Sequence, residues 1–265
     1  MHQKIDMSRF IVALFLISLV GCTADPSSTN SSVDYFAHIE DEKVKSVLRK
    51  AIDWSGGIET WRALDSIKYT KHSMLFLEDE SVESDVIQRH LYGMQPQFSA
   101  NIQWSDSSDV FEIRYDGSAS KWLNGEQLDQ EEGTIKSTVF SALYVLGMPF
   151  KLLDGGVNLS YQGTTSVKGR EADVINATYD PDNHDNHSTS DIWWYYFDVS
   201  NGEFLGCLVY HAPTYAYIEN QSFVTAGGIK FHAHRKSYRS DSARNIQFLR
   251  AEFWYSDYSV VSANP

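Results

Sequence analysis

The stretch DIWWYYFDVSNGEFLGCLVYH, residues 191–211, decides the fold. Two runs of apolar and aromatic residues are separated by Asn201-Gly202, which is typical of the tight turn between two antiparallel strands. From Trp193 to Phe197 the side chains on both faces of the predicted strand are aromatic. Such a strand is covered on both sides, by helix on one side and by sheet or ligand on the other. The stretch therefore predicts a hairpin inside a larger antiparallel sheet.

The same period of two continues on either side of this hairpin. The predicted strands span residues 66–78, 84–94, 97–104, 109–116, 119–124, 157–164, 170–178, 191–198, 203–211, 214–225, 229–239 and 246–257. Consecutive strands joined by tight turns form an antiparallel meander. A helical period appears over residues 39–54 and 58–64, and Val139, Phe140, Leu143, Leu146, Gly147 and Phe150 share one face of a helix that Pro149 breaks. We predict an α+β fold with a strongly curved antiparallel sheet of roughly ten to twelve strands.

The N-terminus has the pattern of an export signal. Basic residues precede an apolar run from Phe10 to Val20, which is too short to span a bilayer. The segment ends in Leu19-Val20-Gly21-Cys22 and resembles the lipobox of bacterial lipoproteins, in which the cysteine receives the lipid. We expect residues 1–21 to be a signal peptide, Cys22 to be lipidated, and residues 22–33 to be a flexible tether. In the sorting rule that this resemblance implies, Thr23 directs the protein to the outer membrane, facing the periplasm, with display on the cell surface left open.

The composition limits the partners and the redox chemistry. The formal net charge of −13 argues against a nucleic-acid partner, whose backbone requires a basic surface. Cys207 is the other cysteine, so no internal disulfide is expected, and its apolar neighbours predict a buried, unreactive thiol.

The order of parts resembles the lipoprotein-localisation fold of LolA and LolB, and more closely a family of uncharacterised periplasmic lipoproteins of that architecture. The segments that carry the resemblance are Ala51-Ile52-Asp53-Trp54-Ser55-Gly56-Gly57 with Trp61, Met148 to Gly156, and Ile192 to Asp198. The resemblance implies an incomplete β-barrel, with helices packed over its concave side and an apolar cavity beneath them. The resemblance spans roughly residues 40–258, and the chain length predicts a single domain over residues 34–265.

Two groups of residues are candidates for a site. The aromatic and apolar candidates for lining the cavity are Phe140, Leu143, Phe150, Trp193, Trp194 and Tyr196, and the alternative is that they pack in the core. Asp182, His184, Asp185 and His187 lie in an acidic, histidine-rich stretch that can bind Zn²⁺ or Ca²⁺, or is a solvated loop.

We assign no binding or catalytic site to three further histidines, which lie in or next to predicted strands. In the strand at 229–239, alternation places His232 and His234 on a solvent-facing stripe with two lysines. His211, at a strand end, is a candidate general base without a visible nucleophile.

We predict a membrane-anchored lipoprotein that binds a lipid or acyl chain, without a cofactor. The sequence has no Gly-x-Ser-x-Gly, no His-Glu-x-x-His, no phosphate-binding glycine loop and no Cys-x-x-Cys, and no catalytic residue is assigned. Two alternatives stay open: a structural or assembly partner of the outer membrane, and a metal-assisted hydrolase.

Overall fold

The computed structural model describes residues 33–182 and 190–262. The predictions for the signal peptide and Cys22, and for His184, Asp185 and His187, lie outside the described residues. Tyr35–Pro265 forms a compact unit. Every residue of its two buried clusters and every strand pair lies within it, so this unit contains all the contacts on which the described fold depends.

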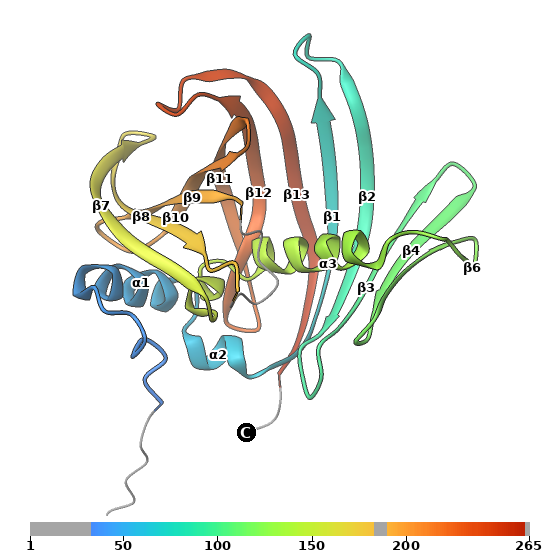
Figure 1. Ribbon diagram of the computed structural model, residues 1–265, viewed down its shortest axis with the longest axis horizontal. Helices are drawn as coiled ribbons and strands as arrows, with labels where there is room; N and C mark the ends of the chain where they lie inside the picture. The colour runs from blue at the N-terminus through green and yellow to red at the C-terminus, as the bar shows by residue number, and fades with distance from the viewer. Residues whose placement is uncertain (1–32, 183–189, 263–265) are drawn as a thin grey trace, which may run out of the picture. The chain divides into compact units, whose positions relative to one another are not determined.

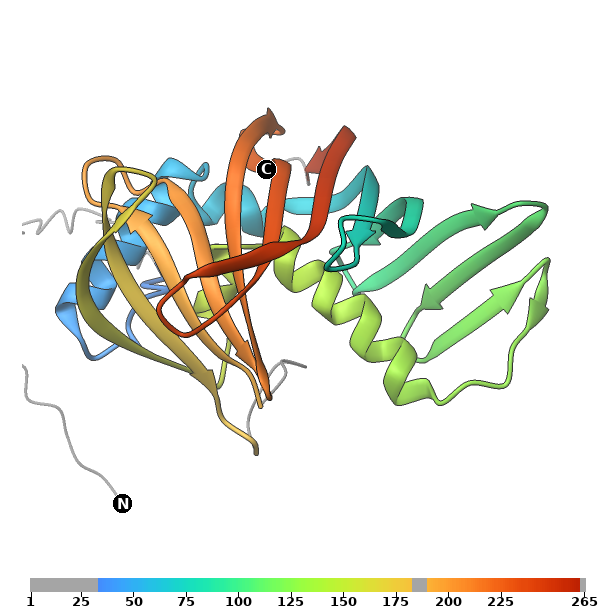
Figure 2. The same cartoon turned by 90° about the horizontal axis from the view of Figure 1, so that it is seen from above.

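The main element is one antiparallel sheet of thirteen strands (Figure 1). Its strands are β1 (Leu64–Phe76), β2 (Val82–Gly93), β3 (Ser99–Asp106), β4 (Asp109–Tyr115), β5 (Ala119–Leu123), β6 (Glu126–Gln127), β7 (Val157–Val167), β8 (Arg170–Tyr179), β9 (Ile192–Asp198), β10 (Phe204–His211), β11 (Thr214–Ala226), β12 (Ile229–Ser240) and β13 (Ile246–Ser262). The spatial order is β6-β5-β4-β3-β2-β1-β13-β12-β11-β10-β9-β8-β7. The sheet is strongly curved and does not close, since β6 and β7 remain its two edges (Figure 2). This confirms the predicted fold class.

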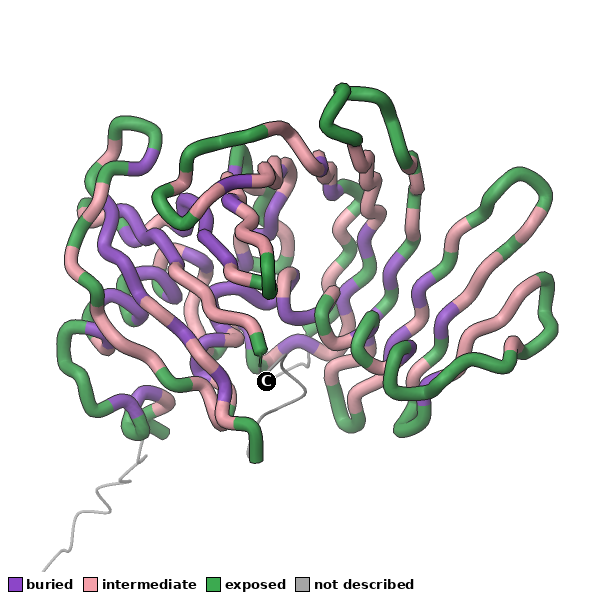
Figure 3. Tube along the Cα trace, turned by 45° about the horizontal axis from the view of Figure 1, so that its top comes forward, coloured by how far each residue is buried: buried purple, intermediate pink, exposed green. Residues whose placement is uncertain are grey.

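Strand β9 is covered on both faces, as its aromatic pattern predicts. Tyr195 and Phe197 belong to the large buried cluster, and Tyr196 belongs to a second, smaller cluster. Buried residues gather in this part of the sheet, in β8, β9 and β10 (Figure 3).

Helix α1 (Glu42–Trp54) starts three residues later than predicted because Asp41 caps it. One carboxylate oxygen of Asp41 accepts hydrogen bonds from the backbone N–H groups of Lys43 and Val44, at 2.8 and 3.2 Å. This satisfies two donors that the first helical turn leaves free. The buried face of α1 consists of Val44, Val47, Leu48, Ala51 and Ile52.

The turn between α1 and α2 (Ile58–Arg62) packs against the hairpin of β11 and β12. Gly56 has a φ of +118°, and a Cβ atom there would lie 2.3 Å from the carbonyl oxygen of Gly228. The backbone N–H of Lys230 donates to the carbonyl of Ser55 at 2.9 Å. Only glycine permits so close a backbone contact in this conformation.

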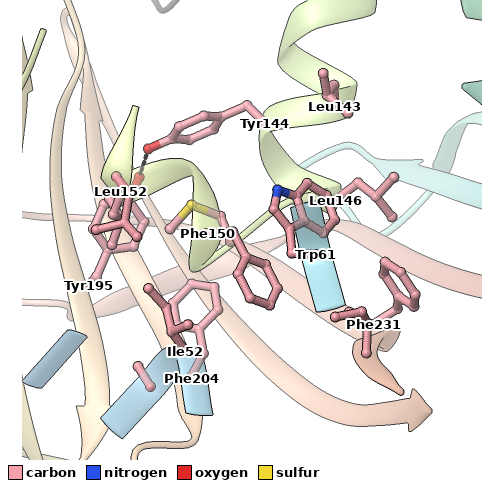
Figure 4. Packing of buried hydrophobic residues seen from close by; sticks show 14 of the residues in the cluster. Ile52, Trp61, Leu143, Tyr144, Leu146, Phe150, Leu152, Tyr195, Phe204 and Phe231 are labelled. Atoms are coloured by element: carbon pink, nitrogen blue, oxygen red, sulfur yellow. Dashed lines mark hydrogen bonds between the residues drawn. The ribbon is translucent and has the colours of Figure 1, made fainter. Parts of the chain in front are cut away.

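Helix α3 (Glu132–Leu146) crosses the concave face of the sheet (Figures 1 and 2). It contacts β4 and β5. The short 3-10 helix η1 (Phe150–Leu153) follows, so the chain does break near Pro149. Phe150 stacks on Trp61 of α2, with ring centroids 4.9 Å apart, and the hydroxyl of Tyr144 is hydrogen-bonded to that of Tyr195 in β9 (Figure 4). These contacts attach the C-terminal end of α3, together with η1, to the rest of the domain.

Candidate functional site

A cavity of about 780 Å³ lies between α3 and the concave face of the sheet, and we call it the α3 pocket. Residues from β1, β2, β3, β9, β11, β12 and β13 line one side, and residues from α3 line the other. The lining is Tyr69, Lys71, Gln88, His90, Ile102, Glu131, Gly133, Thr134, Ser137, Thr138, Ser141, Ala142, Val145, Trp193, Ile218, Arg235, Phe253 and Tyr255. Its volume lies within the range of small-molecule sites, about 300–1,000 Å³.

The sheet wall of the α3 pocket is built from rows of directly paired residues. Tyr69, His90 and Ile102 are cross-strand partners on β1, β2 and β3. Lys71 of β1 is paired with Tyr255 of β13 on one side and with Gln88 of β2 on the other. Because directly opposed residues of a sheet share a face, each row forms a continuous strip of wall.

The helix wall is a stripe of small polar side chains. Thr134, Ser137, Thr138 and Ser141 recur every three or four residues and therefore lie on one face of α3. The opposite face holds the core residues Ile135, Val139, Leu143 and Leu146. The apolar face that the sequence pattern indicates is real, but it packs into the protein while the hydroxyl face lines the pocket.

His90 is a neutral imidazole in the floor of the α3 pocket. It is 2% exposed, and its ring stacks on Tyr69 with centroids 4.7 Å apart. Burial, together with the charge of Lys71, lowers its pKa from 6.5 to about 3. Nδ1 lies 3.2 Å from the hydroxyl of Tyr92, whereas Nε2 has no hydrogen-bond partner in the described part of the protein. A polar atom without a partner is therefore buried beside the pocket.

Arg235 is a buried cation in the same wall. It is 5% exposed, and its Nε donates a 3.0 Å hydrogen bond to the side-chain oxygen of Asn220. The amide nitrogen of Asn220 in turn donates to the carbonyl of Phe204 at 2.8 Å, which fixes the amide orientation. Over residues 33–182 and 190–262, no carboxylate forms an ion pair with this guanidinium.

The structure brings one of the six predicted lining residues to this site. Trp193 of β9 lines the α3 pocket. Trp194 and Tyr196 lie on the other face of the same strand and pack with the second cluster, where the guanidinium of Arg244 lies 5.0 Å from the ring centroid of Tyr196. Successive residues of a strand point to opposite faces, so these three side chains cannot meet in one cavity.

The other three predicted lining residues lie in the packing around α3. Leu143 and Phe150 are buried in the large cluster. Phe140 is half-buried, and its ring lies 5.2 Å from the rings of both Phe98 and Tyr115. None of the three is among the residues that line the α3 pocket.

The structure does not bring the polar candidate residues together in one site. Asp182 is exposed, and its predicted companions lie outside the described residues. Among the residues that the structure does describe, no three His, Cys, Asp or Glu side chains are grouped as a metal site requires. The exposed imidazole of His211 has its Nδ1 2.5 Å from a carboxylate oxygen of Asp191.

The prediction that His232 faces solvent is wrong. Its side chain is 3% exposed and packs against the rings of Phe204 and Phe223, at 5.8 and 5.3 Å. The pairing of β11 with β12 shifts register on both sides of Ser222, which breaks the alternation on which the prediction relied. Burial, then the positive charge of Arg235, lower the pKa of His232 well below its ordinary value.

Cys207 is a free, buried cysteine, as predicted. Burial raises the pKa of its thiol to about 12.

No helix in residues 33–182 and 190–262 combines the length and the apolar character that crossing a bilayer requires.

Comparison with known proteins gives likeness in structure only. No family model matches the chain, and no curated protein sequence matches it. A LolA superfamily protein from Nitrosomonas europaea aligns with a TM-score of 0.51 at 10% identity, covering 82% of this chain and 93% of the other. A DUF1329 family protein from Desulfovibrio piger gives the same TM-score and identity over 82% and 92% of the two chains. The likeness is one of fold: the open, strongly curved antiparallel sheet of this chain is similar to the structure of that LolA superfamily protein.

Proposed function

We propose that the protein is a membrane-anchored lipoprotein whose domain, residues 34–265, binds an apolar ligand such as a lipid or an acyl chain in the α3 pocket. The observation that carries this proposal is the pocket itself. It has the volume of a small-molecule site, and Tyr69, Trp193, Phe253 and Tyr255 give it an aromatic wall. Burial of ligand surface against such a wall provides about 25 cal/mol per Å² before the costs of association.

The anchor is the sequence-based part of the proposal. Residues 1–21 act as a signal peptide, Cys22 carries the lipid, residues 22–33 form a tether, and Thr23 favours the outer membrane facing the periplasm. Stable anchoring requires two or more acyl chains, which a lipidated N-terminal cysteine supplies. An anchored protein of this kind acts as a receptor, a sensor or a scaffold, since it cannot diffuse freely between membranes.

Metabolic labelling tests the anchor. Cells that express the full chain are grown with radioactive palmitate, and the purified protein is examined for label. The wild type is expected to be labelled and Cys22→Ala is expected to carry no label. Equal labelling of the two would show that the lipid is not attached at this cysteine.

Native mass spectrometry tests the ligand. Residues 34–265, purified from a bacterial periplasm, are expected to carry an added lipid mass that is lost on denaturation. Ser141→Trp places a large side chain in the pocket and is expected to reduce the lipid-bound fraction, whereas Ser118→Trp, at an exposed position outside the lining, leaves it unchanged. A wild-type spectrum of ligand-free protein alone, also after incubation with lipid extract, would contradict the proposal.

A further inference from the structure

We propose that the α3 pocket takes a single-chain amphiphile with an anionic head group, a carboxylate or a phosphate ester, which Arg235 and Lys71 bind. The proposal rests on the proposed function, because it assigns the chemistry of the ligand to the same pocket.

The main evidence is Arg235, whose charged side chain is buried and forms no ion pair with any acidic residue that the structure describes. A guanidinium is always protonated in proteins, and a charge taken out of water requires a counter-charge. Its Nε is occupied by Asn220. The two terminal nitrogens match the two oxygens of a carboxylate or a phosphate. They have no acceptor among the residues that the structure describes, and they belong to a residue that lines the pocket. Because the hydrogen bond to Asn220 holds Nε, the plane of the guanidinium is fixed before a ligand binds.

The acidic groups on the strands around Arg235 do not neutralise it. Glu219 and Glu252 are sequence neighbours of the residues paired with Arg235, so they lie on the other face of the sheet. There they are engaged with lysines: Glu219 lies 3.8 Å from Lys168, and Glu252 lies 3.3 Å from Lys236.

On the helix side, Glu131 is the acidic residue that lines the pocket. It precedes the first turn of α3, is exposed to solvent, and forms no ion pair with Arg235 in the described part of the protein. The next residue, Glu132, accepts a 3.0 Å hydrogen bond from the backbone N–H of Ala119. The buried imidazole of His232, beside Arg235, is kept neutral by burial and by that same positive charge.

Lys71 places a second cation on the same wall. Its ammonium lies 5.1 Å from the ring centroid of Phe253, and Phe253 is the direct cross-strand partner of Arg235. Both cations therefore flank one aromatic ring. Lys71 forms no ion pair with any acidic residue that the structure describes. The unpartnered Nε2 of His90, which is the cross-strand neighbour of Tyr69, provides a neutral hydrogen-bonding group on the same floor.

The rest of the lining explains why the ligand is an amphiphile and not a free anion. Tyr69, Ile102, Ile218 and Trp193 offer apolar surface beyond the two cations. A cavity of about 780 Å³ is of the size that holds a molecule of many atoms, and a lone phosphate would leave most of it unfilled. An acyl chain along the aromatic wall with its head group at Arg235 satisfies both parts of the lining.

The test compares ligands of equal chain length. Isothermal titration calorimetry on residues 35–265 measures binding of dodecanoate, of 1-dodecanol and of acetate. We expect dodecanoate to bind about tenfold to a hundredfold more tightly than dodecanol, as a charge-assisted hydrogen bond implies, and acetate to bind far more weakly than either. Arg235→Gln and Lys71→Gln should each reduce dodecanoate affinity and leave dodecanol affinity unchanged. Lys236→Gln, which removes a cation from the opposite face of the same strand, should change neither.

Each contrary outcome has a distinct meaning. Equal affinities for dodecanoate and dodecanol would overturn the anionic head group and leave the proposed function standing. Tight binding of acetate would show an anion site without a chain. Absence of binding by both dodecanoate and dodecanol would overturn the proposed function together with this inference. If circular dichroism shows that Arg235→Gln does not fold, the partly exposed Lys71 and the preference between the two wild-type ligands decide the question.

Discussion

Removal of the Phe150 ring is expected to destabilise the domain strongly, because this ring joins the end of α3 to α2. Phe150 is 3% exposed and stacks on Trp61 with an angle of 1° between the ring planes. Truncation of a buried phenylalanine to alanine costs about 3–5 kcal/mol, which comprises the lost transfer energy and the cavity left behind. We expect Phe150→Ala to lower the free energy of unfolding by that amount.

A second stacked pair in the same protein provides the control. Phe111 lies opposite Trp104 with ring centroids 5.2 Å apart and an interplanar angle of 9°, but both residues are only half-buried. For a cross-strand pair of this kind the expected cost of Phe111→Ala is about 1 kcal/mol or less. Both pairs consist of a phenylalanine stacked on a tryptophan. The difference between the two variants in lost unfolding free energy therefore measures the effect of burial.

Urea unfolding followed by tryptophan fluorescence gives both values, with thermal unfolding as a second measurement. At this chain length each kcal/mol shifts Tm by roughly 2–4 °C, so Phe150→Ala should lower Tm by roughly 6–20 °C. Equal losses for Phe150→Ala and Phe111→Ala would refute the reasoning, because they would show that the attachment of α3 through Trp61 contributes no more than a half-buried stack.

Three further predictions follow from single sites. Gly56→Ala should destabilise the domain by more than about 1 kcal/mol in urea titrations, since its Cβ would meet the Gly228 carbonyl, whereas Gly125→Ala, also at positive φ but with no atom within 4 Å, should cost less. The pKa of His90 is 6.5 in the unfolded chain and about 3 in the folded domain, so the unfolded chain takes up the proton first and the free energy of unfolding decreases as the pH falls from about 6.5 towards 3. His90→Phe should reduce this decrease between pH 7 and pH 4. An unchanged dependence of unfolding free energy on pH would contradict the prediction. Burial raises the pKa of Cys207 to about 12, so iodoacetamide at pH 8 should leave the thiol of native residues 35–265 unmodified and alkylate it in urea, as read by mass spectrometry.

The sheet was predictable because its strands carry strong local signals. Every strand except β6, which has two residues, corresponds to a run of period two or to an apolar run between turn residues. The start of α3 was not predictable from apolar spacing, because its first turn contains exposed Gly133 and Thr134, and the residues that mark the face begin later.

The site was less predictable because the sequence pattern shows which faces are apolar and not what covers them. The apolar face of α3 was expected at the cavity and instead packs into the core. Alternation gave no usable signal for Arg235, because the register shifts beside Ser222 that bury His232 also interrupt the alternation of β12 before Arg235. His90 offered no signal either, since its burial depends on the pairing of β2 with β1 and β3.

The division of α3 into two unlike faces separates two properties that usually change together. Its apolar face contributes to the stability of the domain, and its hydroxyl face borders the pocket without taking part in the core. Substitutions at Thr134, Ser137, Thr138 and Ser141 therefore change the volume and polarity of the pocket, while the packing of the core is unchanged. Positions on a single helix can thus reshape the pocket while Arg235 and Lys71 stay in place on the sheet.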